Sequence, residues 1–286
     1  MSLRTLLHRL TGGYLPPAPP TVAVIRLDGV IATRSGLRGK SLSMAGLAEP
    51  IERAFRLPDL AAVALLINSP GGSPVQSALI ERRIRQLATE KNIPVLAFAE
   101  DVAASGGYWL ALAADEIYAQ DASILGSIGV VSAGFGFPDL LRRFGIERRV
   151  YTAGTSKSML DPFRAEEPED VERLKALQLD IHDSFKDLVR TRRGARLKED
   201  DEIFTGAIFT GRQALARGLI DGIGDLRQVL RERFGKRVRF RLIAERSRRG
   251  FGLRRLGFAS RTSPIDLVTD ALGALEDRAI WARFGL

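Results

Sequence analysis

The 286-residue sequence contains no cysteine, which excludes disulfide bonds and thiolate-bound zinc. It also lacks any apolar run of about 18 residues, the length that a membrane-spanning helix requires. The first twenty residues have no continuous apolar core of the kind found in secretion signals. These absences lead us to expect a cytoplasmic protein without a membrane-spanning anchor.

Charge is distributed unevenly along the chain. The net charge is +9, but residues 231–261 alone hold twelve Lys or Arg against Glu232 and Glu245, so the remainder is close to neutral. A solvated tail would explain this run. The alternative is peripheral attraction to the anionic inner face of a membrane, because residues 6–10 and 265–286 are amphipathic at helical spacing. No aromatic stacking pattern accompanies the charge, so we expect no nucleic-acid partner.

The order of apolar runs predicts an α/β fold. A proline-rich stretch separates an N-terminal amphipathic segment, residues 1–20, from a body at 21–230 and a basic C-terminal extension at 231–286. Strands are expected at 21–31, 61–67, 93–100, 115–120 and 146–154. Helices are expected at 46–60, 73–92, 105–114 and 167–193, and a short strand and two helices at 208–234. Buried strands alternating with helices indicate a mostly parallel sheet covered on both faces.

A glycine-rich turn follows the strand at 61–67. In the segment INSPGGSPVQ, Ser73 is a suitable N-cap, and Gln76 would complete a capping box with it. Gly71 and Gly72 therefore lie at a helix N-terminus, where unpaired N–H groups favour an anion. The turn is either an ordinary strand-to-helix connection or one wall of an oxyanion hole, in which one donor stabilises a transition state by about 3 to 4 kcal/mol.

A serine follows the next buried strand. Ser105 begins a helix in the segment AASGGYWLALAA, and the ends of neighbouring parallel strands meet at one edge of a sheet. The Gly106 N–H would lie beside the Ser105 hydroxyl, and the glycines would allow a substrate backbone to approach closely. Packing alone also selects Ala, Gly and Ser at such a position. The segment thus offers a candidate nucleophile next to the donors of the glycine turn.

Few residues could act as the general base for the Ser105 hydroxyl. Only two histidines exist, His8 before the proline-rich stretch and His182 inside the long helix, and no G-x-S-x-G motif is present, so a Ser-His-Asp triad is not expected. Arginine does not deprotonate, which leaves the lysines. The chain has seven, at positions 40, 91, 157, 175, 186, 198 and 236.

Two lysines fit the role of a base better than the others. Lys157 follows an expected strand and has Met159, Leu160 and Phe163 nearby, which could desolvate its amine and lower its pKa from about 10.4 toward about 7 to 8. Lys40 lies in a loop whose neighbours do not exclude it. A solvent-exposed loop lysine is the competing interpretation of Lys157.

Several ordered segments resemble the signal peptide peptidase A family of bacterial serine proteases, including its shorter SohB-like relatives. They are INSPGGS, AASGGYWLALAADEI, LGSIGVV, TAGTSKSMLDPF and IFTGRQALARGLID, and the resemblance spans roughly residues 22–230. It implies Ser105 as the nucleophile, Lys157 as the general base, Ser127 as a residue that holds the lysine, and oxyanion N–H groups at Gly71 or Gly72.

The resemblance also implies the crotonase-like fold of Clp protease (ClpP), with repeated β-β-α units. Other expectations from it are a homo-oligomer with one catalytic copy per chain, signal peptides or other hydrophobic peptides as substrates, and no metal or other cofactor. Two alternatives remain, an acyl-CoA hydratase or isomerase on the same fold and a catalytically idle membrane-associated scaffold. The hydratase would need a placed carboxylate base.

Overall fold

The computed structural model describes residues 18–33, 41–154, 156–198, 200–243 and 278–286. It divides into two compact units, unit 1 at residues 1–128 and 188–286 and unit 2 at residues 129–187. Most of the N-terminal amphipathic segment, with His8, and the loop containing Lys40 lie outside the described residues. Within the described residues, no helix is long and apolar enough to cross a membrane.

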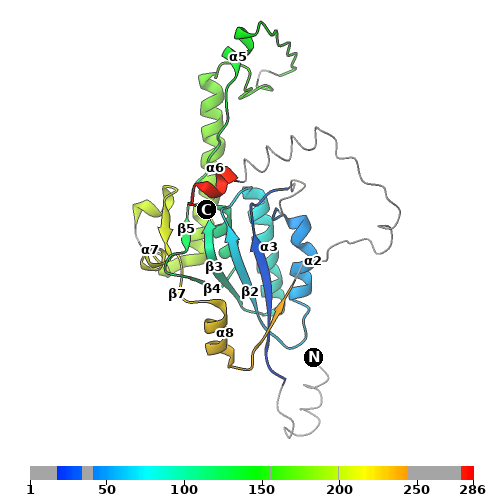
Figure 1. Ribbon diagram of the computed structural model, residues 1–286, viewed down its shortest axis with the longest axis vertical. Coiled ribbons are helices and arrows are strands. Elements are labelled where there is room, and N and C mark those ends of the chain that lie inside the picture. Colours follow the sequence, from blue (N-terminus) through cyan, green and yellow to red (C-terminus); the bar gives the residue numbers. More distant parts are fainter. Residues whose placement is uncertain (1–17, 34–40, 155, 199, 244–277) are drawn as a thin grey trace, which may run out of the picture. The chain divides into compact units, whose positions relative to one another are not determined.

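Unit 1 is built on an eight-stranded sheet with the order β6-β5-β3-β2-β1-β8, in which β4 pairs with β3 and β7 (Figure 1). All pairs are parallel except that of β5 with β6. The strands are β1 (Thr21–Asp28), β2 (Leu60–Ser69), β3 (Val95–Ala104), β4 (Glu116–Ala119), β5 (Ile124–Gly126), β6 (Ile208–Thr210), β7 (Gly222–Ile223) and β8 (Arg239–Leu242). The predicted α/β class and mostly parallel sheet are confirmed.

Helices connect these strands and cover the sheet. They are α2 (Met44–Ala54), α3 (Pro74–Lys91), α4 (Gly106–Ala111), α5 (Pro138–Arg143), α6 (Pro168–Arg193), α7 (Gly211–Ala216) and α8 (Leu226–Phe234), with short 3-10 turns η1 (Gly194–Arg196) and η2 (Asp201–Phe204). Leu230 of α8 packs on Val22, Ala62 and other alternate residues of β1, β2 and β3. The intervening residues, such as Ala23 and Val63, are also buried, as expected where helices cover both faces.

Residues after 230 continue the sheet. The boundary expected at residue 230 falls inside α8, and β8 pairs in parallel with β1 at the edge of the sheet. The basic residues beyond 243 lie outside the described residues.

Unit 2 contains α5 and most of α6, which begins in unit 2 and ends in unit 1. The prediction of a strand at 146–154 is wrong, because the structure has no strand there. Val150 is 43% exposed and Tyr151 is 91% exposed, and a strand forms only where another strand accepts its backbone hydrogen bonds. None pairs with this segment among the described residues.

Candidate active site

The glycine turn after β2 is held by backbone hydrogen bonds and one buried hydroxyl. The Ser69 Oγ donates to the Gly29 carbonyl at 2.7 Å and accepts from the Gly71 N–H at 3.3 Å. Ile31 donates its N–H to the Gly71 carbonyl and accepts from the Ser73 N–H. Gly71 and Gly72 have φ of 105° and 139°, which glycine adopts without a steric penalty. Sequence reasoning missed Ser69, whose type carried no signal beyond its place at a strand end.

The N-terminus of α3 forms as predicted only in part. Ser73 accepts from the Gln76 N–H, so it is the N-cap. The prediction of a capping box is wrong, because the Gln76 Oε1 accepts from the Met44 N–H of α2 at 2.9 Å and not from the Ser73 N–H. The Ser73 N–H is already bonded to Ile31, which leaves it no need of a side-chain acceptor.

Ser105 joins β3 to α4 in a strained backbone conformation. Its φ of 52° and ψ of −121° are rare for a residue with a side chain. The Ser105 N–H donates to the Gly126 carbonyl at 2.8 Å, and its own carbonyl accepts from the Trp109 N–H. The half-buried Ser105 side chain makes no capping bond to α4. Among the described residues, its hydroxyl has no hydrogen-bond partner.

The glycine turn and the start of α4 lie in contact. A Cβ atom built on Gly71 would lie 2.8 Å from the Ser105 Cβ, and one built on Gly106 would lie 3.3 Å from the Gly72 nitrogen. Within the described chain, neither the Gly72 N–H nor the Gly106 N–H has an acceptor, whereas the Gly71 N–H is bonded to Ser69. Two unpaired donors therefore flank Ser105, and Gly72 and Gly106 fit an oxyanion hole better than Gly71 does.

Ser127 lies one residue beyond the pairing of β3 with β5. Ala104 is paired with Gly126, so Ser105 and Ser127 leave adjacent strands at the same level. Ser127 also has a positive φ, of 51°, and its N–H donates to the Ala207 carbonyl at 2.7 Å. The structure thus brings together Ser105, Ser127, Gly71, Gly72 and Gly106, all of which lie in unit 1.

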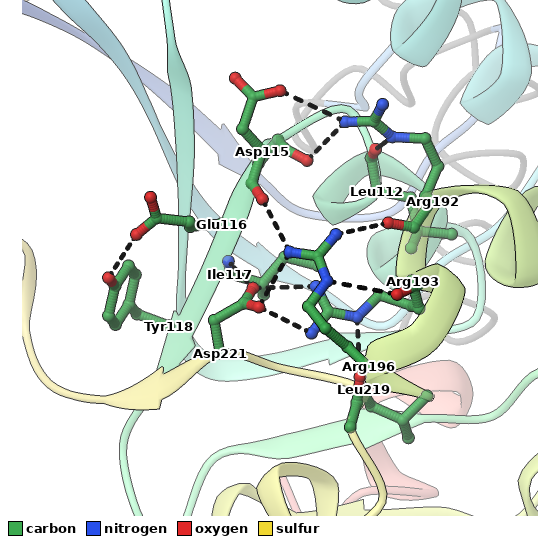
Figure 2. Close-up of polar contacts among 12 residues, drawn as sticks. Leu112, Asp115, Glu116, Ile117, Tyr118, Arg192, Arg193, Arg196, Leu219 and Asp221 are labelled. Carbon is green, nitrogen blue, oxygen red and sulfur yellow. Dashed lines mark hydrogen bonds and ion pairs between the residues drawn. The ribbon is translucent and has the colours of Figure 1, made fainter. Parts of the chain in front are cut away.

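An arginine network anchors the segment that follows α4 (Figure 2). Arg192 donates to the carbonyls of Leu112 and Ala114, each at 2.8 Å. Arg193, only 2% exposed, binds both carboxylate oxygens of Asp221, which also accepts from the Ile117 N–H. Burial raises the pKa of the Asp221 carboxyl, but the Arg193 and Ile117 hydrogen bonds outweigh it and hold the pKa below its ordinary value.

Tyr108 fixes α4 from within the core. Its hydroxyl donates to the Leu219 carbonyl at 2.6 Å, and complete burial raises the pKa of this phenol. The hydrogen bond satisfies the one polar group that the ring carries into the core. α4 is therefore held rigidly, and its first residues present their N–H groups at a fixed place.

Lys157 lies in unit 2, in a turn whose neighbours are tied to arginines. Ser156 accepts from Arg173, and Ser158 accepts from Arg164 at 3.1 Å. The Lys157 side chain is exposed, because Phe163, 39% exposed, and the half-buried Met159 and Leu160 do not enclose it. The apolar pocket expected around this lysine is therefore not formed within unit 2.

Asp161 closes the lysine turn. Its carboxylate is paired with Arg148 and accepts from the Phe163 N–H at 3.0 Å, and these bonds hold the pKa of Asp161 below its ordinary value. The Arg148 guanidinium also lies 4.8 Å above the Phe163 ring. The Pro162 carbonyl accepts from the Phe137 N–H at 2.6 Å, which fixes the end of the turn to the segment before α5.

Of the two histidines, only His182 belongs to the described residues. His182 lies half-buried in α6 within unit 2. Among the described residues, no group of three or more His, Cys, Asp or Glu side chains is placed to hold a metal ion.

Comparisons with known proteins identify the family of the chain. The model of "Peptidase family S49" matches residues 88–236. The whole chain is 48% identical to part of a Na(+)/H(+) antiporter NhaA of Brucella abortus, of which it spans 40%. Over 77% of its length it is 33% identical to a chloroplastic serine protease SPPA of Arabidopsis thaliana, of which it spans 32%.

The fold is similar to that of a solved structure. The solved protein is a lysine-to-alanine mutant of a membrane-bound stomatin-specific protease in complex with a substrate peptide. The match covers 89% of this chain and 98% of the protease chain, at 14% sequence identity and with a TM-score of 0.50. This likeness concerns the fold, and it agrees with the fold that the sequence motifs implied. The chain belongs to peptidase family S49, a family of serine-type peptidases.

Proposed function

We propose that the chain is a serine endopeptidase in which Ser105 is the nucleophile and Lys157 the general base. The observation that carries the proposal is the pair of unpaired N–H groups, of Gly72 and Gly106, beside a strained serine at the end of a parallel strand. A strained backbone at such a position is typical of a functional residue, and fixed donors are what an acyl-transfer reaction requires.

The reaction proceeds through an acyl-enzyme. The neutral Lys157 amine takes the proton of the Ser105 hydroxyl as the oxygen attacks the peptide carbonyl. The Gly72 and Gly106 N–H groups stabilise the oxyanion, and Lys157 returns the proton to the leaving amine. A water molecule then loses a proton to Lys157 and attacks the ester carbon, and the bond to the Ser105 oxygen breaks as that oxygen takes the proton back from Lys157. We assign Ser127 to holding the lysine during these steps.

The proposal requires Lys157 of unit 2 to reach Ser105 of unit 1, in the same chain or in a second copy. Contact with apolar groups of the substrate or of a neighbouring chain would then desolvate its amine. Mixing Ser105→Ala and Lys157→Ala chains distinguishes the two arrangements. Recovered activity means that the dyad forms between copies, and no recovery means that one chain supplies both residues.

Labelling and turnover test the assignment together. A fluorophosphonate label should react with the parent protein and fail to react with Ser105→Ala. Degradation of casein and of a signal peptide should fall about a thousand-fold or more in Ser105→Ala and Lys157→Ala. Lys175→Ala is the matched control, because Lys175 is an exposed α6 lysine paired with Glu172. Unchanged turnover in either dyad variant would rule out the assignment.

Substrates of this site are proposed to be signal peptides or other hydrophobic, unfolded segments. The turn glycines leave the backbone around Ser105 open to an extended chain, whereas a folded protein could not bring its backbone so close. Degradation of casein and of an apolar peptide, compared with a folded protein of similar composition, tests this preference.

We also propose that copies of the chain associate. Unit 2 exposes several large apolar side chains, among them Phe135 at 83%, Phe144 at 72% and Tyr151 at 91%. Exposed apolar side chains commonly mark a protein interface, and a second copy would bury them. Light scattering of the parent and of a Phe135→Ser, Phe144→Ser variant tests this, since the variant should have the lower mass.

Attraction to an anionic membrane surface is proposed for the basic residues after 230. Arg231 of α8, Arg239 and Arg241 of β8, and Arg237 in the turn between them are exposed and could face lipid headgroups. Sedimentation with anionic vesicles should exceed that with neutral vesicles, and it should weaken as salt is added.

A further inference from the structure

A cavity inside unit 2 lies beside the lysine turn. It has a volume of about 390 Å³, and every residue that lines it belongs to unit 2. Ser158, Leu160 and Asp161 line it, and all three follow Lys157 closely in the sequence. Other lining residues come from the segment before α6 and from the beginning of α6. Its size is that of pockets which hold small ligands or single groups of larger ones. We call it the unit 2 cavity.

One buried carboxylate oxygen at the unit 2 cavity lacks a hydrogen bond. The Asp161 side chain is 6% exposed, and its Oδ1 pairs with Arg148 and accepts from the Phe163 N–H. Its Oδ2 is buried as well, and among the described residues no donor reaches that atom. A buried charged oxygen without a hydrogen bond is costly, because it has lost its water and gained no donor in exchange. A ligand that carries an N–H group into the cavity would supply the missing donor.

Further carboxylates make the unit 2 cavity acidic. Glu166, Glu167 and Asp170 line it together with Asp161, and Arg164 is the one cationic side chain among its described lining residues. The Arg164 guanidinium donates to the Ser158 Oγ at 3.1 Å. Within the described chain, the carboxylates of Glu166, Glu167 and Asp170 have no ion-pair partner. Four carboxylates against one guanidinium attract a cation, and a concave site strengthens that attraction.

The distribution of these groups favours a cationic side chain over a metal ion. Among the described residues, no three acidic side chains lie close enough together to hold a metal ion, so the carboxylates are spread along the cavity. The half-buried Leu160 and Leu174 add apolar surface to the lining. Lysine and arginine combine an apolar stem with a cationic head, and therefore match both kinds of surface.

We propose that the unit 2 cavity binds a lysine or arginine side chain of the peptide substrate, whose cationic head donates to the Asp161 Oδ2. This inference rests on the proposed function, because it is the role of Lys157 as the base that brings the cavity near the cleaved bond. It narrows the substrate class to apolar peptides with a basic residue close to that bond. Signal peptides combine such residues, since a positively charged region precedes their apolar run.

The turnover test compares peptides that differ only by lysine or norleucine, which keeps the stem of lysine and lacks its ammonium group. The residue is placed at successive positions on either side of the cleaved bond, and mass spectrometry identifies the bond that is cut. At one position we expect kcat/KM of the parent to be about ten-fold higher for lysine. In the double variant Glu167→Gln, Asp170→Asn this preference should fall to about three-fold or less. Equal values for lysine and norleucine at every position in the parent would overturn the proposal.

The matched control removes the same charge elsewhere on α6. Glu172 and Asp180 are exposed in unit 2 and do not line the cavity, so Glu172→Gln, Asp180→Asn should keep the full lysine preference. Thermal unfolding establishes that both double variants fold. Light scattering tests whether the cavity instead receives a basic side chain of a second copy. A lower mass for Glu167→Gln, Asp170→Asn alone would show this and overturn the assignment to substrate.

A binding test removes the dependence on catalysis. In a Ser105→Ala background, the fluorescein-labelled lysine peptide should bind about ten-fold more tightly than the norleucine peptide, and adding Glu167→Gln, Asp170→Asn should reduce this difference. Displacement by the free diamine cadaverine as effective as by the unlabelled lysine peptide would overturn the proposal, because the cavity would then recognise a free amine. If the affinities differ as expected while the parent shows no turnover, the proposed function fails and the cavity inference stands. If turnover is present and the two peptides bind equally, the cavity inference fails.

Discussion

The backbone N–H of Ser105 donates to the carbonyl oxygen of Gly126 at 2.8 Å, at the point where β3 and β5 end together. The next residue on each strand, Ser105 and Ser127, has a positive φ, of 52° and 51°. A glycine at either position would adopt this backbone conformation without strain, yet both positions hold a serine with a hydroxyl. Strain of this kind persists where the surrounding structure enforces it, and it gathers at reactive sites.

Relief of the Ser105 strain gives a direct prediction. Ser105→Gly and Ser105→Ala both remove the hydroxyl and should both be inactive. Ser105→Gly should be more stable than Ser105→Ala by about 1 kcal/mol, because only glycine adopts this conformation freely. Urea unfolding measures the difference. A Ser105→Ala protein as stable as Ser105→Gly would mean that the conformation at this residue is not strained.

Close contact between α3 and α4 gives a second prediction. A Cβ atom on Gly106 would lie 2.6 Å from the Oγ of the buried Ser77. Gly106→Ala should therefore lower stability by about 1 to 3 kcal/mol and displace the Gly106 N–H, reducing turnover ten-fold or more. The double variant Gly106→Ala, Ser77→Ala lacks the obstructing oxygen, so it should recover part of the lost stability and part of the lost turnover.

Gly134→Ala serves as the control for this pair, since a Cβ atom there would meet nothing within 4 Å. It should leave stability and turnover unaltered. A Gly106→Ala protein with full activity would show that the close contact with Ser77 does not fix the position of the Gly106 N–H.

Local sequence signals predicted much of unit 1. The apolar runs gave β1, β2 and β3 within a few residues. Because parallel strands end at a common edge, the sequence alone predicts that the glycine turn and Ser105 lie together. Strand β8 was missed, since its arginine-rich sequence gives no apolar run.

Long-range partners could not be read from the sequence. Gln76 has the spacing of a capping box, yet it binds Met44, 32 residues away. Residues 146–154 have the composition of a strand but find no pairing partner among the described residues. Lys157 became a candidate by elimination, by its apolar neighbours and by resemblance, and no local pattern relates a loop in unit 2 to a serine in unit 1.

The buried Arg193–Asp221 pair gives a prediction for acid stability. The pKa of Asp221 is lowered in the folded chain, so its contribution is fully present above its unfolded pKa of about 4 and is lost as the pH falls through the folded pKa. Asp221→Asn leaves Arg193 buried without a charged partner and should cost about 3 to 5 kcal/mol at neutral pH.

Urea unfolding from pH 3 to pH 7 should accordingly show a weaker dependence on pH in Asp221→Asn than in the parent. Asp121→Asn is the control, because Asp121 is 52% exposed and pairs with an exposed Arg212. It should cost well under about 1 kcal/mol. Equal losses in the two variants would contradict a structural role for the arginine network.

The lysine turn offers two neighbouring arginines in different surroundings. Arg148 pairs with Asp161, whose side chain is 6% exposed, whereas Arg149 pairs with Glu147, whose side chain is 71% exposed. If the Asp161 contact holds the turn that carries Lys157, Arg148→Ala should lower kcat about ten-fold and Arg149→Ala should leave it unchanged. Arg148→Lys keeps the charge but loses the planar donor group, so it should recover only part of the rate.

The pH profile separates this role from a general loss of stability. Arg148 is the largest cause of the lowered pKa of Asp161, so removing it should raise that pKa. As the solution is acidified, Asp161 of the Arg148→Ala variant would be protonated at a higher pH than in the parent, and the lysine turn would lose its order there. The fall of kcat on the acidic side of its pH profile should therefore move to a higher pH. Equal kcat values and acidic limbs in Arg148→Ala and Arg149→Ala would show that the Asp161 contact does not position Lys157.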